Sequence, residues 1–371
     1  MKKSVLFFIP KLETGGAENQ IIELANYLSN KSYEIIIITI VRGEHRFELL
    51  NNNIKIIELN CSRTLYSFFK ILKIIINYRN VVIFSIIRHL NILILIANFF
   101  LLLKKKIYII ETSLLKNHLK HNKKFIYYFI FSFLTYISYP FAYKIIAPSK
   151  TSAKILKKNF LLKKKIIHIY NPVNIKKILE LSNTQFIPKI LEQNRDNQII
   201  VSIGRLTWEK DYETLINSFK QVEKKINNVI LIILGNGKEK KNIINLINKN
   251  KLQDKIFLLG NVSNPYVYLK HCDLYILSSI SELFPTSLIE SLIFKTSIIS
   301  TDCEYGPSEI LEKGKWGTLV PVKNIKLMAE NIIKLISNNT PNNNKNLIRA
   351  YDFDLEVSMI NYIKLIGHIY E

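Results

Sequence analysis

Acidic side chains are scarce in the first half of this 371-residue chain, where no aspartate precedes Asp196. Residues 1–190 hold 30 lysines and arginines against nine glutamates, whereas residues 191–371 hold 22 against 20. An excess of one sign indicates a polyanionic partner, either nucleic acid or an anionic membrane surface. Residues 101–110 and 116–143 interleave lysines with bulky apolar side chains, and no nucleic-acid-binding motif accompanies them. The sequence therefore favours the membrane surface and predicts no nucleic-acid partner.

Cysteine is also rare, and the three that occur are Cys61, Cys272 and Cys303. Because their number is odd and no spacing pairs them, they offer neither a disulfide framework nor a zinc site, and we expect buried thiols. One Asp-x-Asp pair, Asp352 and Asp354, has the composition of a divalent-metal site for a diphosphate. It opens the last predicted helix, far in sequence from every strand end, where aspartate is an ordinary helix cap. The sequence thus predicts no metal and no cofactor.

Long hydrophobic runs are limited to residues 125–143, which contain no charge over a length close to the roughly 20 residues that cross a bilayer. The run holds Pro140 and five tyrosines, so an interfacial helix and a buried helix both fit it better than a crossing. The N-terminal run breaks at Pro10 and Lys11 without a small-residue cleavage site, which is typical of a first strand and not of a signal peptide. We therefore expect a cytoplasmic protein, peripheral on the inner face of the cytoplasmic membrane.

Short β-branched runs alternate with longer amphipathic segments along the chain, and its length suits two domains. "SVLFFIP" precedes an amphipathic segment and then "YEIIIITI", an alternation typical of βαβ units with a parallel sheet. The alternation restarts after the polar stretch 180–198. We predict two doubly wound α/β domains, 1–185 and 186–345, and a helix in 346–371 that can pack back on the first domain. Ligands bind at the carboxyl ends of such strands, so two facing domains would form a cleft.

The stretch "SIGRLTWEKDYETL" follows a predicted strand and brings two cations onto one loop. Gly204 ends the strand, and Arg205 and Lys210 lie five residues apart beside backbone amides. Two cations that converge in this way form a diphosphate clamp, although a loop arginine and lysine can also be merely solvated. The later "LGNGKEK" contains a Gly-x-Gly turn, which either lets a ligand approach the backbone or is simply a tight turn.

The stretch "SELFPTSLIE" combines two glutamates with a predicted helix start. Pro285 suits the first position of a helix and leaves the amides of the following residues free to bind an anion. Glu282 lies on the loop before this helix, and Glu290 lies about 7–8 Å further along the helix axis. The two carboxylates are therefore expected to reach opposite ends of an extended ligand. The amides belong to Thr286, Ser287 and Leu288.

Together these motifs resemble those of the retaining glycosyltransferases of family 4, which have the GT-B fold of two facing Rossmann-like domains. The resemblance covers nearly the whole chain, and the order and spacing of its motifs are specific. The motifs are "TGGAE", "KIIAPS", "YNPV", "GRLTWEK", "LGNG", "FLLGNVSNPYVYLKHCDLYILSS", "ELFPTSLIE" and "STDCEYGPSEIL".

The resemblance implies roles for individual residues. Arg205 and Lys210 would bind the donor diphosphate and stabilise the charge on the leaving group, with Glu282 as the third catalytic residue. Glu290 would bind the ribose, and Val262 would lie by the base. The remaining donor-binding positions are Gly15, Gly16, Gly204, Phe284, Pro285, Thr286, Ser287 and Leu288. Such enzymes are expected to retain anomeric configuration by front-face attack without a covalent nucleophile or a metal.

The sequence departs from the family pattern at three places. Leu283 and Asp211 stand where relatives often have glycine. Many relatives also carry a Glu-His pair after a strand of the first domain, whereas here Glu111 is followed by Thr112. His118 could replace this histidine on the acceptor side only if the loop folds back, and a solvated basic face among Lys116, Lys120 and His121 is the favoured explanation.

From the resemblance we expect transfer of a hexose or N-acetylhexosamine, from a UDP-linked donor to a lipid-linked saccharide. The pathway would be cell-surface polysaccharide or glycan biosynthesis, such as lipopolysaccharide or capsule. Two alternatives stay open at this point: a nucleotide-sugar epimerase or hydrolase on the same scaffold, and a non-catalytic membrane-bound protein that binds nucleotide sugars.

Overall fold

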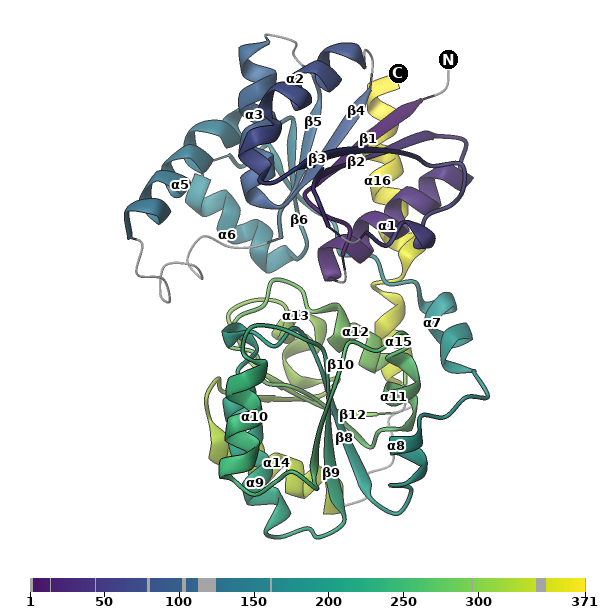
Figure 1. Ribbon diagram of the computed structural model, residues 1–371, viewed down its shortest axis with the longest axis vertical. Helices are drawn as coiled ribbons and strands as arrows, with labels where there is room; N and C mark the ends of the chain where they lie inside the picture. The colour runs from purple at the N-terminus through teal and green to yellow at the C-terminus, as the bar shows by residue number, and fades with distance from the viewer. Residues whose placement is uncertain are drawn as a thin grey trace. The chain divides into compact units, whose positions relative to one another are not determined.

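The chain folds into two compact units, seen in the computed structural model in Figure 1. The first unit comprises Met1–Pro172 and Leu355–Glu371, and the second comprises Val173–Asp354. The structure describes residues 3–13, 15–43, 45–78, 81–101, 105–112, 125–160, 162–294, 296–337 and 345–370.

The first unit is built on a seven-stranded sheet in which all neighbouring strands are parallel, in the order β3-β2-β1-β4-β5-β6-β7. Its central strands β1, β4 and β5 are mostly apolar and almost wholly buried, because helices cover both faces of a parallel sheet. The strands are β1 (Ser4–Ile9), β2 (Glu34–Val41), β3 (Lys55–Cys61), β4 (Val82–Ile86), β5 (Ile107–Ile110), β6 (Lys144–Ala147) and β7 (Ile166–His168).

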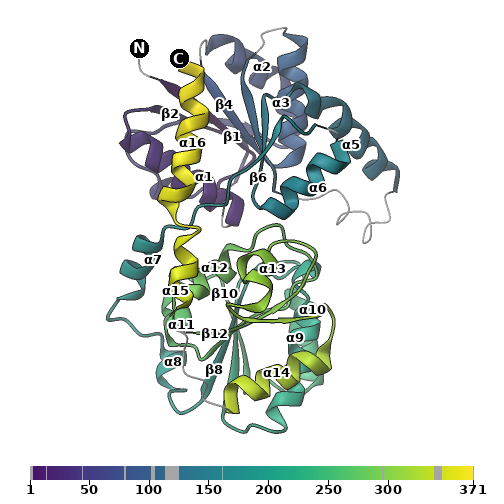
Figure 2. The same ribbon diagram turned by 180° about the vertical axis from the view of Figure 1, so that it is seen from behind.

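The helices of the first unit lie in two layers. One layer contains α1 (Gly16–Asn30) and α16 (Leu355–Tyr370), which lie side by side in Figure 2. Gln20 Nε2 donates to Tyr362 Oη at 3.0 Å, and Tyr108 Oη donates to the Leu365 carbonyl at 3.0 Å, so α16 is part of the first core. The short helix η1 (Phe47–Leu49) packs beside α1, where Asn26 Nδ2 donates to the Leu49 carbonyl at 2.8 Å. The other layer contains α2 (Phe68–Asn77), α3 (Arg88–Phe100), α5 (Phe125–Ser138) and α6 (Lys150–Phe160), with the short helices η2 (Thr64–Ser67) and η3 (Tyr139–Phe141) nearby.

The predicted apolar segment forms α5 and η3, and it is amphipathic by burial. Thr135, Ser138 and Tyr139 are buried, whereas Phe129 and Phe133 are more than half exposed. Within the described ranges, no helix combines the length and apolarity that a bilayer crossing requires.

The second unit contains a six-stranded parallel sheet in the order β10-β9-β8-β11-β12-β13. Its strands are β8 (Gln198–Ile203), β9 (Val229–Leu234), β10 (Ile256–Gly260), β11 (Leu274–Leu277), β12 (Ser297–Thr301) and β13 (Thr318–Val320). Its helices are α7 (Ile175–Ser182), α8 (Lys189–Glu192), η4 (Trp208–Lys210), α9 (Tyr212–Glu223), α10 (Lys240–Lys249), α11 (Tyr266–His271), α12 (Thr286–Leu292), α13 (Pro307–Ile310), η5 (Glu312–Gly314), α14 (Ile325–Ser337) and α15 (Asn346–Tyr351). The doubly wound α/β class predicted from the sequence is confirmed.

The unit boundaries differ from the expected ones. The first unit ends at Pro172 and not at residue 185, because α7 packs against α11 of the second unit and Lys270 Nζ donates to the Ser182 carbonyl at 3.2 Å. The expected tail 346–371 is divided: α15 packs on α12 in the second unit, and only α16 returns to the first.

Candidate functional site

The strand order of the second sheet reverses between β8 and β11, because the chain winds one way through β9 and β10 and the other way through β12 and β13. In doubly wound sheets, ligands bind outside the carboxyl ends of the strands at such a switch point. The loop 204–211 follows β8, and the loop 278–285 follows β11. The two motifs that the sequence singled out therefore meet at this position, which we call the switch-point site.

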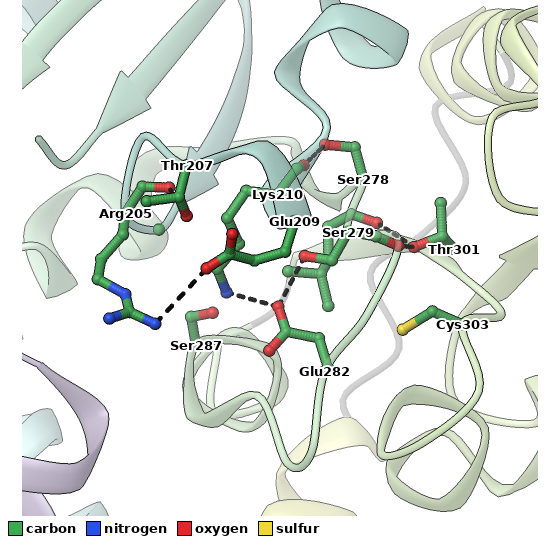
Figure 3. A network of polar contacts seen from close by, with 12 residues as sticks. Arg205, Thr207, Glu209, Lys210, Ser278, Ser279, Glu282, Ser287, Thr301 and Cys303 are labelled. Carbon is green, nitrogen blue, oxygen red and sulfur yellow. Dashed lines mark hydrogen bonds and ion pairs between the residues drawn. The ribbon is translucent and has the colours of Figure 1, made fainter. Parts of the chain in front are cut away.

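A partly buried ion pair lies at the centre of the switch-point site (Figure 3). Lys210 Nζ is 2.5 Å from Glu282 Oε1, and the two side chains are 14% and 12% exposed. Ser279 Oγ donates to the same carboxylate oxygen at 2.7 Å. Thr301 Oγ1 donates to the Ser279 carbonyl at 2.5 Å, and Ser278 Oγ donates to the Lys210 carbonyl at 2.7 Å. Loops after three strands thus hold the lysine and the glutamate in place.

Arg205 differs from Lys210 in its exposure. Its side chain is 70% exposed, and its Nη2 lies 3.7 Å from Glu209 Oε1. A contact of this length between exposed groups is weak, so the guanidinium can turn to an anion in solution. The clamp predicted from Arg205 and Lys210 is therefore asymmetric, with one cation exposed and the other already paired.

Gly204 leaves room for the lysine stem. A Cβ at this position would lie 3.2 Å from Lys210 Cε and 3.1 Å from Tyr212 Oη, which itself donates to the Gly204 carbonyl at 3.0 Å. The absence of a side chain at Gly204 thus leaves the space in which Lys210 lies beside Glu282.

Asp211 stands directly after the clamp lysine, where relatives often have a glycine. Its φ is 48°, in the left-handed region that glycine adopts at no steric cost and aspartate tolerates. Its carboxylate accepts from the amide of Thr214 at 3.3 Å and from Thr214 Oγ1 at 2.7 Å, which caps α9. Leu283, the other departure, does not adopt a positive φ. Both departures therefore fit the local backbone.

The Gly-x-Gly turn after β9 is explained by contact between two loops. A Cβ at Gly235, where φ is 135°, would lie 2.0 Å from the Gly204 carbonyl oxygen, and a Cβ at Gly237 would lie 2.3 Å from the Leu206 carbonyl oxygen. The two glycines let this turn pack against the loop after β8. The structure thus favours the tight-turn interpretation over ligand approach.

The start of α12 differs slightly from the prediction. Pro285 is the residue before the helix, and α12 begins at Thr286. The amide of Leu288 donates to the Pro285 carbonyl at 3.2 Å, so the amides of Thr286 and Ser287 are the ones that helix geometry leaves for an anion. Ser287 Oγ accepts from Tyr275 Oη at 2.8 Å, which fixes its orientation.

Two further positions of the motif serve packing. Phe284 is buried and makes an edge contact with Phe353, with ring centroids 5.4 Å apart. Gly306, at φ 83°, packs under Pro285, since a Cβ there would lie 2.7 Å from Pro285 Cδ. Val262 lies in the loop after β10, at the edge of the sheet, and is partly buried.

Glu290 lies on α12 and is partly buried. Burial raises the pKa of its carboxyl group to about 7. Near Glu282, burial also raises the pKa of the Cys303 thiol to about 12, so this thiol stays protonated and is no nucleophile at neutral pH.

The first-unit candidates lie at the carboxyl edge of the first sheet. Gly15 and Gly16 follow β1 at the start of α1. Glu111 follows β5 but is enclosed: Arg88 Nη2 lies 2.9 Å from its Oε1, and Tyr139 Oη donates to its Oε2 at 2.7 Å. Both carboxylate oxygens thus have protein partners, which indicates a structural role and not the predicted acceptor contact. His118 lies outside the described residues.

Among the described residues, no cluster of three or more His, Cys, Asp or Glu side chains is placed to hold a metal ion. Asp352 pairs with Arg349 at 2.6 Å. The three cysteines are free and buried, as expected. Sequence reasoning missed Ser278, Ser279 and Thr301, although each is a hydroxyl at the end of a buried strand, which is the signal that could have revealed them.

The comparisons with known proteins assign the chain to a family. Residues 14–177 match the family described as Glycosyltransferase Family 4, and residues 183–351 match Glycosyl transferases group 1. The chain belongs to these glycosyltransferases, as the resemblance of its motifs predicted.

Curated relatives support this assignment. An uncharacterized glycosyltransferase of Methanocaldococcus jannaschii is 34% identical over 61% of this chain and 65% of the relative, so the chain matches less than two thirds of that protein's length. A Campylobacter jejuni protein, GalNAc-alpha-(1->4)-GalNAc-alpha-(1->3)-diNAcBac-PP-undecaprenol alpha-1,4-N-acetyl-D-galactosaminyltransferase, is 26% identical over 98% of both chains.

Among solved structures, Anabaena Alr3699/HepE in complex with UDP-glucose has a TM-score of 0.81 at 18% identity, over 98% of this chain and 99% of that one. Likeness at this identity concerns the fold alone, and it confirms the predicted GT-B class.

Proposed function

We propose that this chain is a retaining glycosyltransferase that moves a hexose or N-acetylhexosamine from a UDP-linked donor to a lipid-linked saccharide. The observation that carries the proposal is the Lys210–Glu282 pair beside the exposed Arg205, at the switch point of the group 1 domain. A site with two cations, free helix amides and two carboxylates matches an extended ligand that has a diphosphate in its middle and hydroxyls at both ends.

Each residue then has a role in transfer. The donor diphosphate binds Arg205 and competes with Glu282 for Lys210, so the two cations stabilise the negative charge that develops as the sugar bond breaks. Glu282 accepts from hydroxyls of the sugar, and Glu290 accepts from those of the ribose. With two cations supplying positive charge at the diphosphate, we expect transfer without a metal.

We expect retention without a covalent intermediate. Lys210 and Ser279 hold Glu282 through its Oε1, which suits a carboxylate that positions the sugar. Attack by the acceptor on the face from which the diphosphate leaves requires no nucleophile from the protein.

The relatives supply the choice of donor and acceptor. Solved neighbours contain UDP or UDP-glucose, and the Campylobacter relative is named for an undecaprenol-linked acceptor. By extension, this chain would take UDP-sugars and act on a lipid-linked saccharide, in lipopolysaccharide, capsule or glycan assembly, as a peripheral protein at the cytoplasmic face of the membrane.

A donor and acceptor screen tests the proposal. Labelled UDP- and GDP-sugars are incubated with the purified full chain and membrane lipid extract, and products are read by mass. We expect a lipid product from a UDP-sugar. Turnover of donor without acceptor would indicate an epimerase or hydrolase, and calorimetry that detects no binding of any nucleotide sugar would leave only a non-catalytic role.

A further inference from the structure

Three neighbouring helices of the first unit expose large apolar side chains. Phe69 on α2 is 81% exposed and Phe100 at the end of α3 is 70% exposed. We call this set the aromatic face: Leu65, Tyr66, Phe69, Ile76, Phe99, Phe100, Phe129, Ile130, Phe133, Leu134, Tyr136, Ile137, Phe141 and Tyr143. Exposed apolar residues scattered singly are ordinary, whereas a gathering of this size on one layer marks an interaction surface.

The aromatic face combines segments that are far apart in sequence. Helix α3 packs against α2 and against α5, and all three cover the same face of the first sheet (Figure 1). The ring of Phe99 lies 4.5 Å from that of Phe141, which joins the end of α3 to η3 after α5. Helix α2 and η2, which also pack on α3, add exposed apolar side chains that the apolar run at 125–143 did not indicate.

Helix α2 shows how the sequence pattern leaves apolar side chains exposed. Its Ile71 and Ile75 are fully buried against the unit, whereas Phe69, Lys73 and Ile76 point away from it and are exposed. A helix that carries an aromatic and a lysine on its outer side has the composition of one lying in a membrane interface.

Charge identifies the occupant of the aromatic face. Between Glu58 and Glu180 the only acidic residue is Glu111, which is buried against Arg88. Lysines accompany the face, including Lys106, whose Nζ lies 5.3 Å from the ring centroid of Tyr143. A second copy of the chain would bring the same positive charge and be repelled, whereas anionic lipid headgroups are attracted.

We infer that the aromatic face docks on the surface of an anionic lipid bilayer, with its rings among the headgroups and the neighbouring lysines on the phosphates. The inference rests on the proposed function only in that a lipid-linked acceptor would be met there. Because binding to lipid needs neither donor nor acceptor, the two can fail separately.

Flotation of the purified full chain with vesicles tests the docking, without donor or acceptor. The probes are vesicles of phosphatidylglycerol with phosphatidylcholine, and of phosphatidylcholine alone. The variants are Phe69→Ser and the double variant Phe129→Ser with Phe133→Ser. The matched control is Phe186→Ser, because Phe186 is 71% exposed in the second unit. Thermal melting checks that each variant folds.

We expect binding to the anionic vesicles that falls about tenfold in the double variant and a few-fold in Phe69→Ser, with no change in the control. Binding should also weaken at high salt and on neutral vesicles. No binding by the parent chain, or equal binding by all variants, would overturn the inference. If the variants lose self-association while their vesicle binding is unchanged, the inference is also overturned. The aromatic face would then be assigned to contact with a second copy of the chain. Transfer to a detergent-solubilised acceptor should stay at the parent level, and absent transfer with intact vesicle binding would contradict the proposed function alone.

Discussion

Each unit carries a cation–glutamate pair at the carboxyl edge of its sheet, and the two pairs differ in burial and in what can reach them. In the first unit, Arg88 and Glu111 are 3% and 0% exposed, and Tyr139 takes the second carboxylate oxygen. In the second unit, Lys210 and Glu282 are 14% and 12% exposed. The first pair is closed to ligands, whereas a ligand can compete for the second.

Next to each pair, the backbone has a non-glycine residue with a positive φ. Ile87, directly before Arg88, has φ 74°, and Asp211, directly after Lys210, has φ 48°. A β-branched residue in this region is an outlier, whereas aspartate tolerates it. Similar residue types at equivalent sheet edges thus serve different ends: exposure decides whether an ion pair stabilises the fold or takes part in binding.

The largest effect on stability is expected from opening the enclosed pair. Arg88→Ala leaves the carboxylate of Glu111 buried without its cation, which should lower the free energy of unfolding by about 3–5 kcal/mol. Urea unfolding, monitored by circular dichroism, measures this loss of unfolding free energy. The double variant Arg88→Met with Glu111→Gln should recover most of the loss, and a single-variant loss below about 1 kcal/mol would contradict an enclosed pair.

Removing the cation of the Lys210–Glu282 pair should instead lower the rate of transfer. Lys210→Ala removes a cation from the leaving diphosphate, and we expect transfer to fall by about 10²–10³-fold. Stability should fall less than in Arg88→Ala, because solvent reaches Glu282. Initial rates with the UDP-sugar found in the screen measure the first effect, and urea unfolding measures the second. Lys224→Ala, on the surface at the end of α9, is the control. A variant with parent activity and a large loss of stability would make the two pairs equivalent.

Glu290 sharpens the comparison, since its partly buried carboxylate is paired with no cation among the residues that the structure describes. Because its pKa is raised to about 7 from an ordinary value near 4.5, the folded state binds more protons than the unfolded state between these values. Stability should therefore fall as the pH rises from about 4.5 to 7, by roughly 1–3 kcal/mol. Glu290→Gln should flatten this part of the curve. Urea midpoints between pH 4.5 and 8 measure it, and identical slopes in parent and variant would contradict the assignment.

The smallest effect concerns the left-handed residue of the second unit. Asp211→Ala loses the cap on α9 and keeps the unfavourable φ, so unfolding should become easier by about 1–2 kcal/mol. Asp211→Gly loses the cap but relieves the backbone, so its change should be within about 0.5–1 kcal/mol. Thermal melting of both variants measures the difference. Equal losses would show that φ at this position has no energetic role.

The sequence predicted the two sheets and the loops that carry the switch-point site, because aliphatic runs and strand-end motifs are local signals. It did not predict that Lys210 is paired, since its partner Glu282 is 72 residues away in the chain. It set the first boundary at residue 185, whereas α7 packs on α11 through contacts such as Lys270 to Ser182, which are 88 residues apart and leave no local pattern. The segment at 125–143 was recognisable as interfacial or buried from its long uncharged run. In α2, the exposed Phe69 stands next to Lys70, and the lysines interrupt any such run.

Helix α16 has a consequence for the order in which the chain can fold. Tyr362 and Ile366 complete the first core, yet they follow the whole second unit in sequence. On a ribosome, residues 173–354 emerge as a complete unit while the first sheet still lacks a covering helix. The second unit can therefore finish folding first, and the first unit, although made earlier, keeps apolar surface exposed until α16 has been made. Removal of Leu355–Glu371 would accordingly damage the first unit, although the second unit precedes this segment in the chain.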